Sequence, residues 1–155
     1  MKVLVVYDSY FGNTEKIARA VGSALGLTDG DIVKVSDVKP GQTTGLDILI
    51  VGSPTRAFQA SNGTKAFLKS LPSDALKGVK VAAFDTRMTV DDKTPAFLRV
   101  LVKIFGYAAE PIARRLARKG GSQVLEPAGF LVDDTEGPLH EGELERAAEW
   151  VKPIK

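Results

Sequence analysis

The sequence of 155 residues has no cysteine and a single histidine, His140. The lack of cysteine excludes disulfide bonds, iron–sulfur clusters, thiolate metal sites and a cysteine nucleophile. With only one histidine, a histidine-based metal centre or acid–base triad is not expected either. Any redox chemistry would therefore need an organic cofactor to hold the electrons. A protein without disulfides is also most simply placed in the cytoplasm.

Long hydrophobic runs are missing as well. No stretch approaches the roughly 18 apolar residues that can span a bilayer. The apolar residues at positions 3–6 meet Asp8 too soon to form a secretory signal, so we interpret them as a buried strand. Hydrophobic residues at 44% and charged residues at 26% are typical of a folded globular protein, and the length predicts one domain over residues 1–155.

The charge is nearly balanced, with a net charge of +2, but it is unevenly distributed. Basic residues concentrate between Arg99 and Lys119, and acidic residues between Glu126 and Glu149. Two solvated helix faces of opposite sign explain this pattern, and steering of a charged partner is the alternative. The basic stretch has no interleaved aromatic residues and no known reading motif, so nucleic-acid binding is not expected.

Apolar and β-branched runs alternate with helical patterns along the chain. Strands are predicted at residues 2–7, 32–35, 47–52 and 79–84, and a last strand in two pieces at 122–125 and 129–132. Helices are predicted at residues 14–25, 64–71, 108–119 and 139–151. This alternation predicts a doubly wound α/β domain with a five-stranded parallel sheet in the order 2-1-3-4-5.

Residues 88–107 fit this rhythm poorly. They begin with polar residues and continue with an apolar helix that starts at Thr94 and ends at Phe105, interrupted by Arg99 and Lys103. Such a helix is apolar on more than one face, so we expect it to pack against something. A lid on its own domain is the favoured interpretation. A wall of a substrate pocket, peripheral contact with a membrane surface and a buried partner contact are the alternatives.

The loop after the first strand is rich in hydrogen-bonding groups. Ligands of open α/β sheets bind outside the carboxyl ends of the strands, where the strand order reverses. The loop contains Ser9, Tyr10, Phe11, Gly12, Asn13 and Thr14. It leads into a helix N-terminus, which favours an anion, although a loop closed by a helix cap at Asn13 is the structural alternative. Because the loop has no Lys or Arg and matches neither a P-loop nor a dinucleotide fingerprint, hydroxyls and backbone amides would hold a phosphate there.

Residues 5–21, which read VVYDSYFGNTEKIARAV, resemble the phosphate-loop signature of the flavodoxin family. The resemblance implies a flavodoxin-like fold that binds the 5′-phosphate of flavin mononucleotide (FMN) through the hydroxyls and backbone amides of this loop. It further implies an electron carrier that works between redox partner proteins, as a monomer or weak dimer. The strand–helix rhythm extends the resemblance over nearly the whole chain.

By the same resemblance, two further loops flank the flavin. The loop after the third strand provides Pro54, Thr55, Arg56, Ala57 and Phe58, and Phe58 is expected to stack on the ring. The loop after the fourth strand provides Asp85, Thr86, Arg87 and Met88. Many flavodoxins place a tyrosine against the ring from this loop, whereas here Arg87, Met88 or Tyr107 would take its place. If both Arg56 and Arg87 approach the flavin, its second reduction potential should be higher than in an acidic flavodoxin.

Two other functions are alternatives to an electron carrier. An FMN-dependent oxidoreductase that acts on a quinone or porphyrinogen-like substrate is the main alternative, favoured by the apolar helix. A phospho-acceptor receiver domain shares the sheet order but needs an acidic pair, an acceptor Asp and a Lys. Here Asp8 stands alone, the third strand ends in Gly52-Ser53-Pro54, and no Lys follows the last strand. No catalytic residue and no metal site is assigned.

Overall fold

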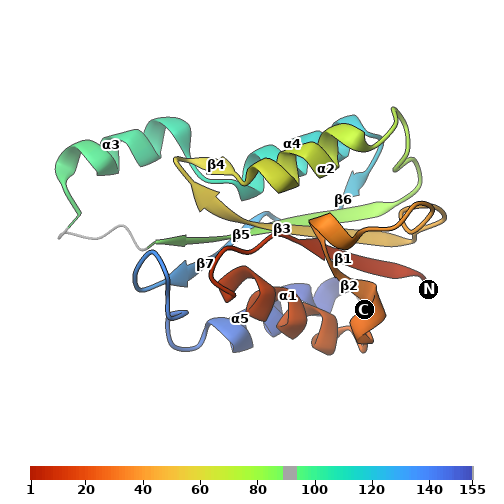
Figure 1. Cartoon of the computed structure of the whole chain (residues 1–155), viewed down its shortest axis with the longest axis horizontal. Helices are drawn as coiled ribbons and strands as arrows, with labels where there is room; N and C mark the ends of the chain where they lie inside the picture. The colour runs from red at the N-terminus through yellow and green to blue at the C-terminus, as the bar shows by residue number, and fades with distance from the viewer. Residues whose placement is uncertain (89–93, 155) are drawn as a thin grey trace.

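The computed structural model of the chain describes residues 1–88 and 94–154 (Figure 1). The parallel strands are β1 (Val3–Tyr7), β2 (Ile32–Lys34), β3 (Ile48–Arg56), β5 (Lys80–Met88), β6 (Ser122–Gln123) and β7 (Ala128–Val132). They lie in the order β2-β1-β3-β5, and β6 and β7 pair with successive parts of β5. The predicted order 2-1-3-4-5 is therefore confirmed, with the last strand in two pieces. The order reverses at β1, whose neighbours are β2 and β3.

Helices cover both faces of this sheet. They are α1 (Asn13–Ala24), α2 (Asn62–Ser70), α3 (Ala96–Phe105), α4 (Ala109–Arg118) and α5 (Glu143–Val151). Figure 1 shows α1 and α5 on one face and α2 and α4 on the other. Helix α5 starts later than the predicted residue 139, because Leu139 forms a β-bridge with Val132 and the helix begins only after Gly142.

Strand alternation divides the core between the two faces. In β1, Leu4 and Val6 pack toward α2 and α4, whereas Val3 and Val5 pack toward α1 and α5. Strands β3 and β5 alternate in the same way. Because both faces are covered, the central strands are apolar at almost every position, as in other parallel sheets. On the α1 face, the rings of Phe84, Phe130 and Trp150 meet edge to face, with centroids 6.0 Å apart.

Strands β3 and β5 are longer than predicted. Residues 53–56 and 85–88 were predicted as loops, but they continue the two strands. Pairing of Ser53 with Asp85 and of Pro54 with Thr86 extends the ladder. The partner strand β7 supports β5 from the other side as far as Met88. The sequence-based loop assignment was wrong here because these polar residues are held in the sheet by partners that are distant in sequence.

A tight hairpin follows β3. Strand β4 (Gln59–Ala60) turns back antiparallel to the end of β3, where Arg56 pairs with Gln59. The two residues of the turn, Ala57 and Phe58, have φ values of 48° and 66°. A two-residue loop with positive φ at both residues is the hairpin turn whose twist matches that of the flanking strands. Asn-Gly is the usual sequence for this turn. The turn fixes where Phe58 lies.

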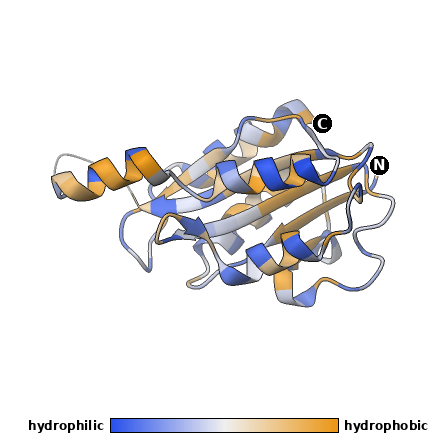
Figure 2. Ribbon diagram, turned by 90° about the horizontal axis from the view of Figure 1, so that it is seen from above, coloured by the Kyte–Doolittle hydropathy of each residue, from blue (hydrophilic) through white to orange (hydrophobic). Residues whose placement is uncertain are grey.

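Helix α3 lies beyond the end of the sheet, as Figures 1 and 2 show, and Figure 2 colours most of it hydrophobic. Its exposed side chains include Phe97, Val100 and Ile104, at 66%, 53% and 66% exposure. None of its described side chains is buried or belongs to either core. The predicted lid that packs on its own domain is therefore wrong. Part of the polar segment predicted before it, residues 89–93, lies outside the described residues. Within the described part of the chain, no helix is long and apolar enough to cross a membrane.

Candidate functional site

A cleft opens at the carboxyl ends of β1, β3 and β5, next to the point where the strand order reverses. Residues from all three predicted segments line it: Ser9, Tyr10, Phe11, Asn13, Thr14, Pro54, Thr55, Arg56, Ala57, Thr86, Arg87 and Met88. Val132 and Thr135 complete the lining. Of the other predicted residues, Gly12 shapes the first loop, Asp85 is buried beneath the edge of the sheet, and Phe58 lies elsewhere.

Hydrogen bonds within the first loop set its shape. The buried Asp8 carboxylate accepts the Ser9 N–H at 2.9 Å and the Ser61 hydroxyl at 2.6 Å. The Ser9 hydroxyl in turn accepts the Gly12 N–H at 2.9 Å. Gly12 has a φ of 90°, a conformation that favours glycine, and it occupies the N-cap position of α1. The prediction that Asn13 caps the helix is wrong, because its amide donates to the Glu136 carbonyl instead.

The N-terminus of α1 is left open toward the cleft. The first bond of the helix runs from the Lys16 N–H to the Gly12 carbonyl at 3.1 Å. The N–H groups of Asn13, Thr14 and Glu15 therefore have no carbonyl partner within the helix, and no side chain of the described residues accepts them. Since Asn13 and Thr14 line the cleft, these groups and the positive end of the helix dipole make this part of the cleft electrostatically favourable for an anion.

A hydroxyl pair joins this helix end to the sheet. The Thr14 and Thr86 hydroxyl oxygens are 2.8 Å apart, and both residues are buried and line the cleft. One hydroxyl donates to the other, which leaves one proton of the pair for a ligand. The pair also fixes α1 against β5, so the donors at the helix end are held in place before any ligand binds.

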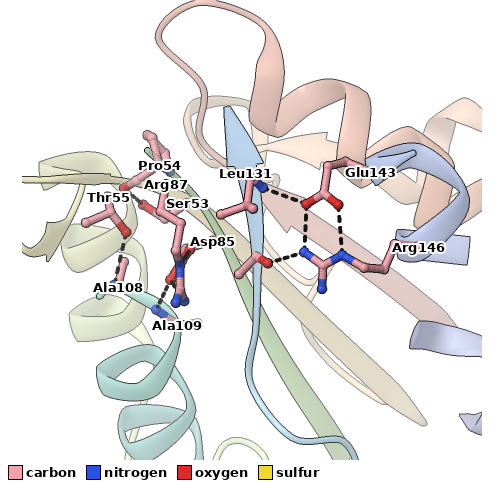
Figure 3. Close-up of polar contacts among 11 residues, drawn as sticks. Ser53, Pro54, Thr55, Asp85, Arg87, Ala108, Ala109, Leu131, Glu143 and Arg146 are labelled. Atoms are coloured by element: carbon pink, nitrogen blue, oxygen red, sulfur yellow. Dashed lines mark hydrogen bonds and ion pairs between the residues drawn. The ribbon is translucent and has the colours of Figure 1, made fainter. Parts of the chain in front are cut away.

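The N-terminus of α4 lies at the same edge of the sheet but on the other face, and it is closed. The fully buried Asp85 carboxylate accepts the Ala109 N–H at 2.9 Å (Figure 3). The Thr55 hydroxyl accepts the Ala108 N–H at 3.1 Å. Asp85 also receives two hydrogen bonds from Arg87, both of 2.7 Å. Burial raises the pKa of the Asp85 carboxyl, and the Arg87 guanidinium opposes that rise.

The two arginines predicted at the flavin lie on different faces of the sheet. Strand alternation places Thr86 on the α1 face and Arg87 on the α4 face with Asp85. The Arg87 guanidinium lies 3.7 Å from the ring centroid of Tyr107. Gly129 makes room for it, because a Cβ at Gly129 would lie 2.1 Å from that group. Arg87 borders the cleft, but its charge is neutralised by Asp85 on the far face.

Arg56 occupies a different environment. Its side chain is exposed, lines the cleft and lies 4.9 Å from the ring centroid of Tyr10. Phe58, on the other side of the hairpin turn, does not join it. Phe58 lines a second hollow together with Lys65, Pro111 and Arg115, against α4. The structure therefore brings Arg56, but not Phe58, to the cleft.

Sequence reasoning missed Val132 and Thr135, which follow the last strand. The Thr135 hydroxyl donates to the Met88 sulfur at 3.7 Å and so connects this loop to the end of β5. The rule that ligands bind at the carboxyl ends of strands, applied to β7 as well, would have pointed to these residues.

A second carboxylate supports β7 behind the cleft. Glu143 accepts the Leu131 N–H at 2.6 Å and two hydrogen bonds from Arg146, at 2.9 and 2.7 Å (Figure 3). Arg146 also donates to the Gly129 carbonyl. The hydrogen bonds from Arg146 lower the pKa of Glu143, whereas its burial opposes the change. This pair ties α5 to the strand that carries Gly129 and Val132.

Comparison with known proteins gives a consistent picture. The model of the flavodoxin domain family matches residues 4–103. The chain is similar in structure to a flavodoxin from the domain Archaea, with a TM-score of 0.72, 21% identity and coverage of 99% of this chain and 96% of that one. Oxidised flavodoxin 1 from Bacillus cereus gives a TM-score of 0.72 at 18% identity, covering 98% and 95%.

A larger protein contains the same fold. Rubredoxin oxygen:oxidoreductase from Desulfovibrio gigas gives a TM-score of 0.70 at 19% identity, and the match covers 99% of this chain but 35% of that one. These structural likenesses establish the fold. Among curated protein sequences, none matches the chain.

Proposed function

This chain belongs to the flavodoxin family, and we propose that its cleft binds one FMN and that the protein carries electrons between redox partners. The observation that carries this proposal is the uncapped N-terminus of α1, which faces a cleft at the switch point of the sheet. When bound, FMN supplies one- and two-electron chemistry, and the protein holds and orients it.

The donor set at α1 fits a phosphate group. Three backbone N–H groups, at residues 13–15, are available where the helix dipole is positive. The Ser9 hydroxyl accepts a hydrogen bond from Gly12 and keeps its own proton to donate. The Thr14 and Thr86 pair offers a further proton. These neutral donors would hold the phosphate without a Lys or Arg in the loop.

The rest of the cleft fits a flat, largely apolar ring. Tyr10, Phe11 and Met88 line it and are 49%, 46% and 48% exposed, which is unusual for large apolar side chains. Pro54 and Thr55 bring the backbone of β3 to the cleft beside them. A bound ring would cover this apolar surface, while backbone amides of the same segment would contact its polar edge.

The lining also bears on the reduction potential. Among the described residues that line the cleft there is no carboxylate and no histidine, and Arg56 is an exposed cation there. Negative charge on the reduced flavin would therefore meet less repulsion than in a site surrounded by acids. We expect the second reduction potential to be higher than in a strongly acidic flavodoxin. A redox titration that gives a potential as low as in such a flavodoxin would contradict this expectation.

Visible absorption of the purified protein tests the proposed cofactor. The apoprotein should be titrated with FMN, FAD and riboflavin. We expect the flavin absorption bands to shift on binding, and the shift to occur at a lower concentration of FMN than of FAD or riboflavin. If no flavin binds under any condition, the open helix end is structural and the proposed function is wrong.

A second candidate function is an FMN-dependent oxidoreductase that reduces a quinone or porphyrinogen-like compound directly. The exposed apolar helix α3, at the same end of the sheet as the cleft, favours it. Turnover of a soluble quinone with reduced nicotinamide and the purified FMN-loaded protein would support this candidate. If the protein is inactive alone and becomes reduced only when a separate reductase is added, the result would support the electron carrier.

A further inference from the structure

Helix α3 carries an apolar stripe that the rest of the chain leaves exposed. Phe97, Val100 and Ile104 are spaced by three and four residues, so they lie on one side of the helix. Each is more than half exposed, and none belongs to either core of the domain. Three large apolar side chains exposed in one stripe indicate a contact surface rather than an ordinary solvated helix face.

The charged residues of α3 itself are both positive. Arg99 and Lys103, one helical turn apart, are both exposed and flank the stripe on the same side. The sequence has no acidic residue from position 94 to position 109, and Glu110 is the first. A short helix with an apolar stripe and cations but no acids fits an interface that is apolar inside and anionic at its surface.

A second copy of this chain would not complement that surface. In a symmetric dimer the same patch meets itself, so Arg99 and Lys103 would approach the same cations of the other copy. No acid of α3 would neutralise them. An anionic lipid surface avoids this repulsion, because the long side chains of both cations can reach the headgroups while the apolar stripe enters the acyl region.

We propose that α3 is a membrane-surface helix that inserts Phe97, Val100 and Ile104 into the interface of an anionic bilayer. Arg99 and Lys103 contact the lipid headgroups. Figure 1 shows α3 beyond the end of the sheet to which β3 and β5 point, and the cleft lies at the carboxyl ends of these strands. This contact therefore holds the mouth of the cleft close to the membrane. The proposal rests on α3 alone and does not depend on which flavin, if any, the cleft binds.

Vesicle flotation with the full-length protein tests the proposal. Vesicles of phosphatidylcholine and phosphatidylglycerol in equal parts should bind the protein, and vesicles of phosphatidylcholine alone should bind it much less. Replacing both Arg99→Gln and Lys103→Gln should lower binding to the mixed vesicles about fivefold for each cation removed. Binding should also weaken as salt is added, because the attraction to the surface is screened.

The apolar contribution is tested by Phe97→Ser combined with Ile104→Ser. We expect a loss of at least about tenfold in binding to the mixed vesicles, because this apolar area no longer enters the interface. Since both residues are exposed and outside the cores, the variant should keep the thermal unfolding midpoint of the unmodified protein.

Matched controls lie elsewhere on the surface. Arg114→Gln with Arg118→Gln removes two exposed cations at the same spacing from α4, and Leu144→Ser removes an apolar side chain of 42% exposure from α5. Neither control should change vesicle binding by more than about twofold, because a membrane held by α3 leaves these positions in solution.

Three results would overturn the proposal. The first is no binding of the unmodified protein to the mixed vesicles. The second is equal loss of binding in the α3 variants and the α4 control, which would indicate attraction by overall charge. The third is a dimer in solution that the Phe97→Ser and Ile104→Ser changes convert to a monomer without any effect on vesicles, which would show that a second copy covers the stripe.

Discussion

The N-termini of α1 and α4 lie at the same carboxyl edge of the sheet, on opposite faces, and differ in what meets their backbone N–H groups. At α4, the buried Asp85 carboxylate accepts the Ala109 N–H, and the Thr55 hydroxyl accepts that of Ala108. At α1, the Ser9 hydroxyl accepts the N–H of the N-cap residue Gly12, but among the described residues no side chain accepts the N–H groups of residues 13–15. The nearby Asp8 carboxylate instead binds Ser9 and Ser61.

The difference shows that two helix ends at one sheet edge can serve different purposes, one to stabilise the fold and the other to remain available to a ligand. A helix end that receives a carboxylate from its own chain has its positive dipole and free donors compensated, so it stabilises the fold and offers little to a ligand. A helix end left without such a partner, at the edge of a cleft, remains available to an anion. In this protein the comparison supports the proposed anion site at α1, on the neutral loop, and gives α4 a structural role.

Removing the internal carboxylate should have the largest effect. In Asp85→Ala, the Ala109 N–H loses its acceptor and the Arg87 guanidinium loses its buried partner. We expect the free energy of unfolding to fall by about 3–5 kcal/mol, as for other broken buried ion pairs. Urea denaturation measures this loss, and Asp37→Ala, at an exposed site, should change it by less than about 0.5 kcal/mol. A loss in Asp85→Ala as small as that of the control would show that α4 does not need its internal anion.

Supplying α1 with a carboxylate of its own should close the open site. In Ser9→Asp the new carboxylate takes a position whose hydroxyl now accepts the Gly12 N–H. We expect the affinity for FMN to fall at least about tenfold, because a like charge repels the phosphate where the helix dipole attracted it. Riboflavin, which has no phosphate, should bind as before. Ser9→Asn is the uncharged control, and an equal loss for FMN and riboflavin would contradict the assignment of the anion site.

Glu143 is a second internal carboxylate, with the opposite direction of pKa shift from Asp85. Its pKa is lowered from an ordinary value of about 4.5, so its contribution to stability is complete above that value and is lost as the pH falls through the lower, folded-state pKa. In Glu143→Gln we expect a loss of about 1 kcal/mol at neutral pH and less further loss in acid than the unmodified protein shows. Denaturation curves between about pH 7 and pH 3 measure this slope. A variant that keeps the full acid dependence would contradict the role given to Glu143.

Removing Arg56, the exposed cation at the cleft, should have the smallest effect. Arg56 lines the cleft, whereas Arg87 is paired with Asp85 on the closed side. In Arg56→Gln we expect the second reduction potential of the bound flavin to fall by on the order of 20 mV, because a cation near the reduced ring has been removed. Arg114→Gln removes an equal charge from the exposed face of α4 and should leave the potential unchanged. Equal shifts in both variants would show that Arg56 acts through net charge alone.

Local signals made the strand order and the first loop predictable from the sequence. Buried parallel strands leave continuous apolar runs, and a loop of hydroxyl, amide and glycine residues before an amphipathic helix indicates an anion site. Residues 9–14 carry that information themselves, so Ser9, Asn13 and Thr14 lie at the cleft as expected.

The remaining features depend on contacts that are distant in sequence. Residues 85–88 look like a loop until β7 pairs with them, and the guanidinium of Arg87 is directed by Asp85 and by the missing Cβ of Gly129. The hairpin that turns Phe58 toward α4 lacks the usual Asn-Gly signal. For α3, hydrophobicity indicated that a contact is needed but not that the domain itself would leave the helix uncovered.

The ratio of the dissociation constants for FMN and riboflavin tests the central claim most directly. Both can be measured on the apoprotein by the quenching of flavin fluorescence. If the open end of α1 binds the phosphate, FMN should bind at least about a hundredfold more tightly, since several hydrogen bonds to a charged group are gained. Inorganic phosphate should then compete with FMN. Equal affinity for FMN and riboflavin would contradict the account, because the open helix end would then contribute nothing to binding.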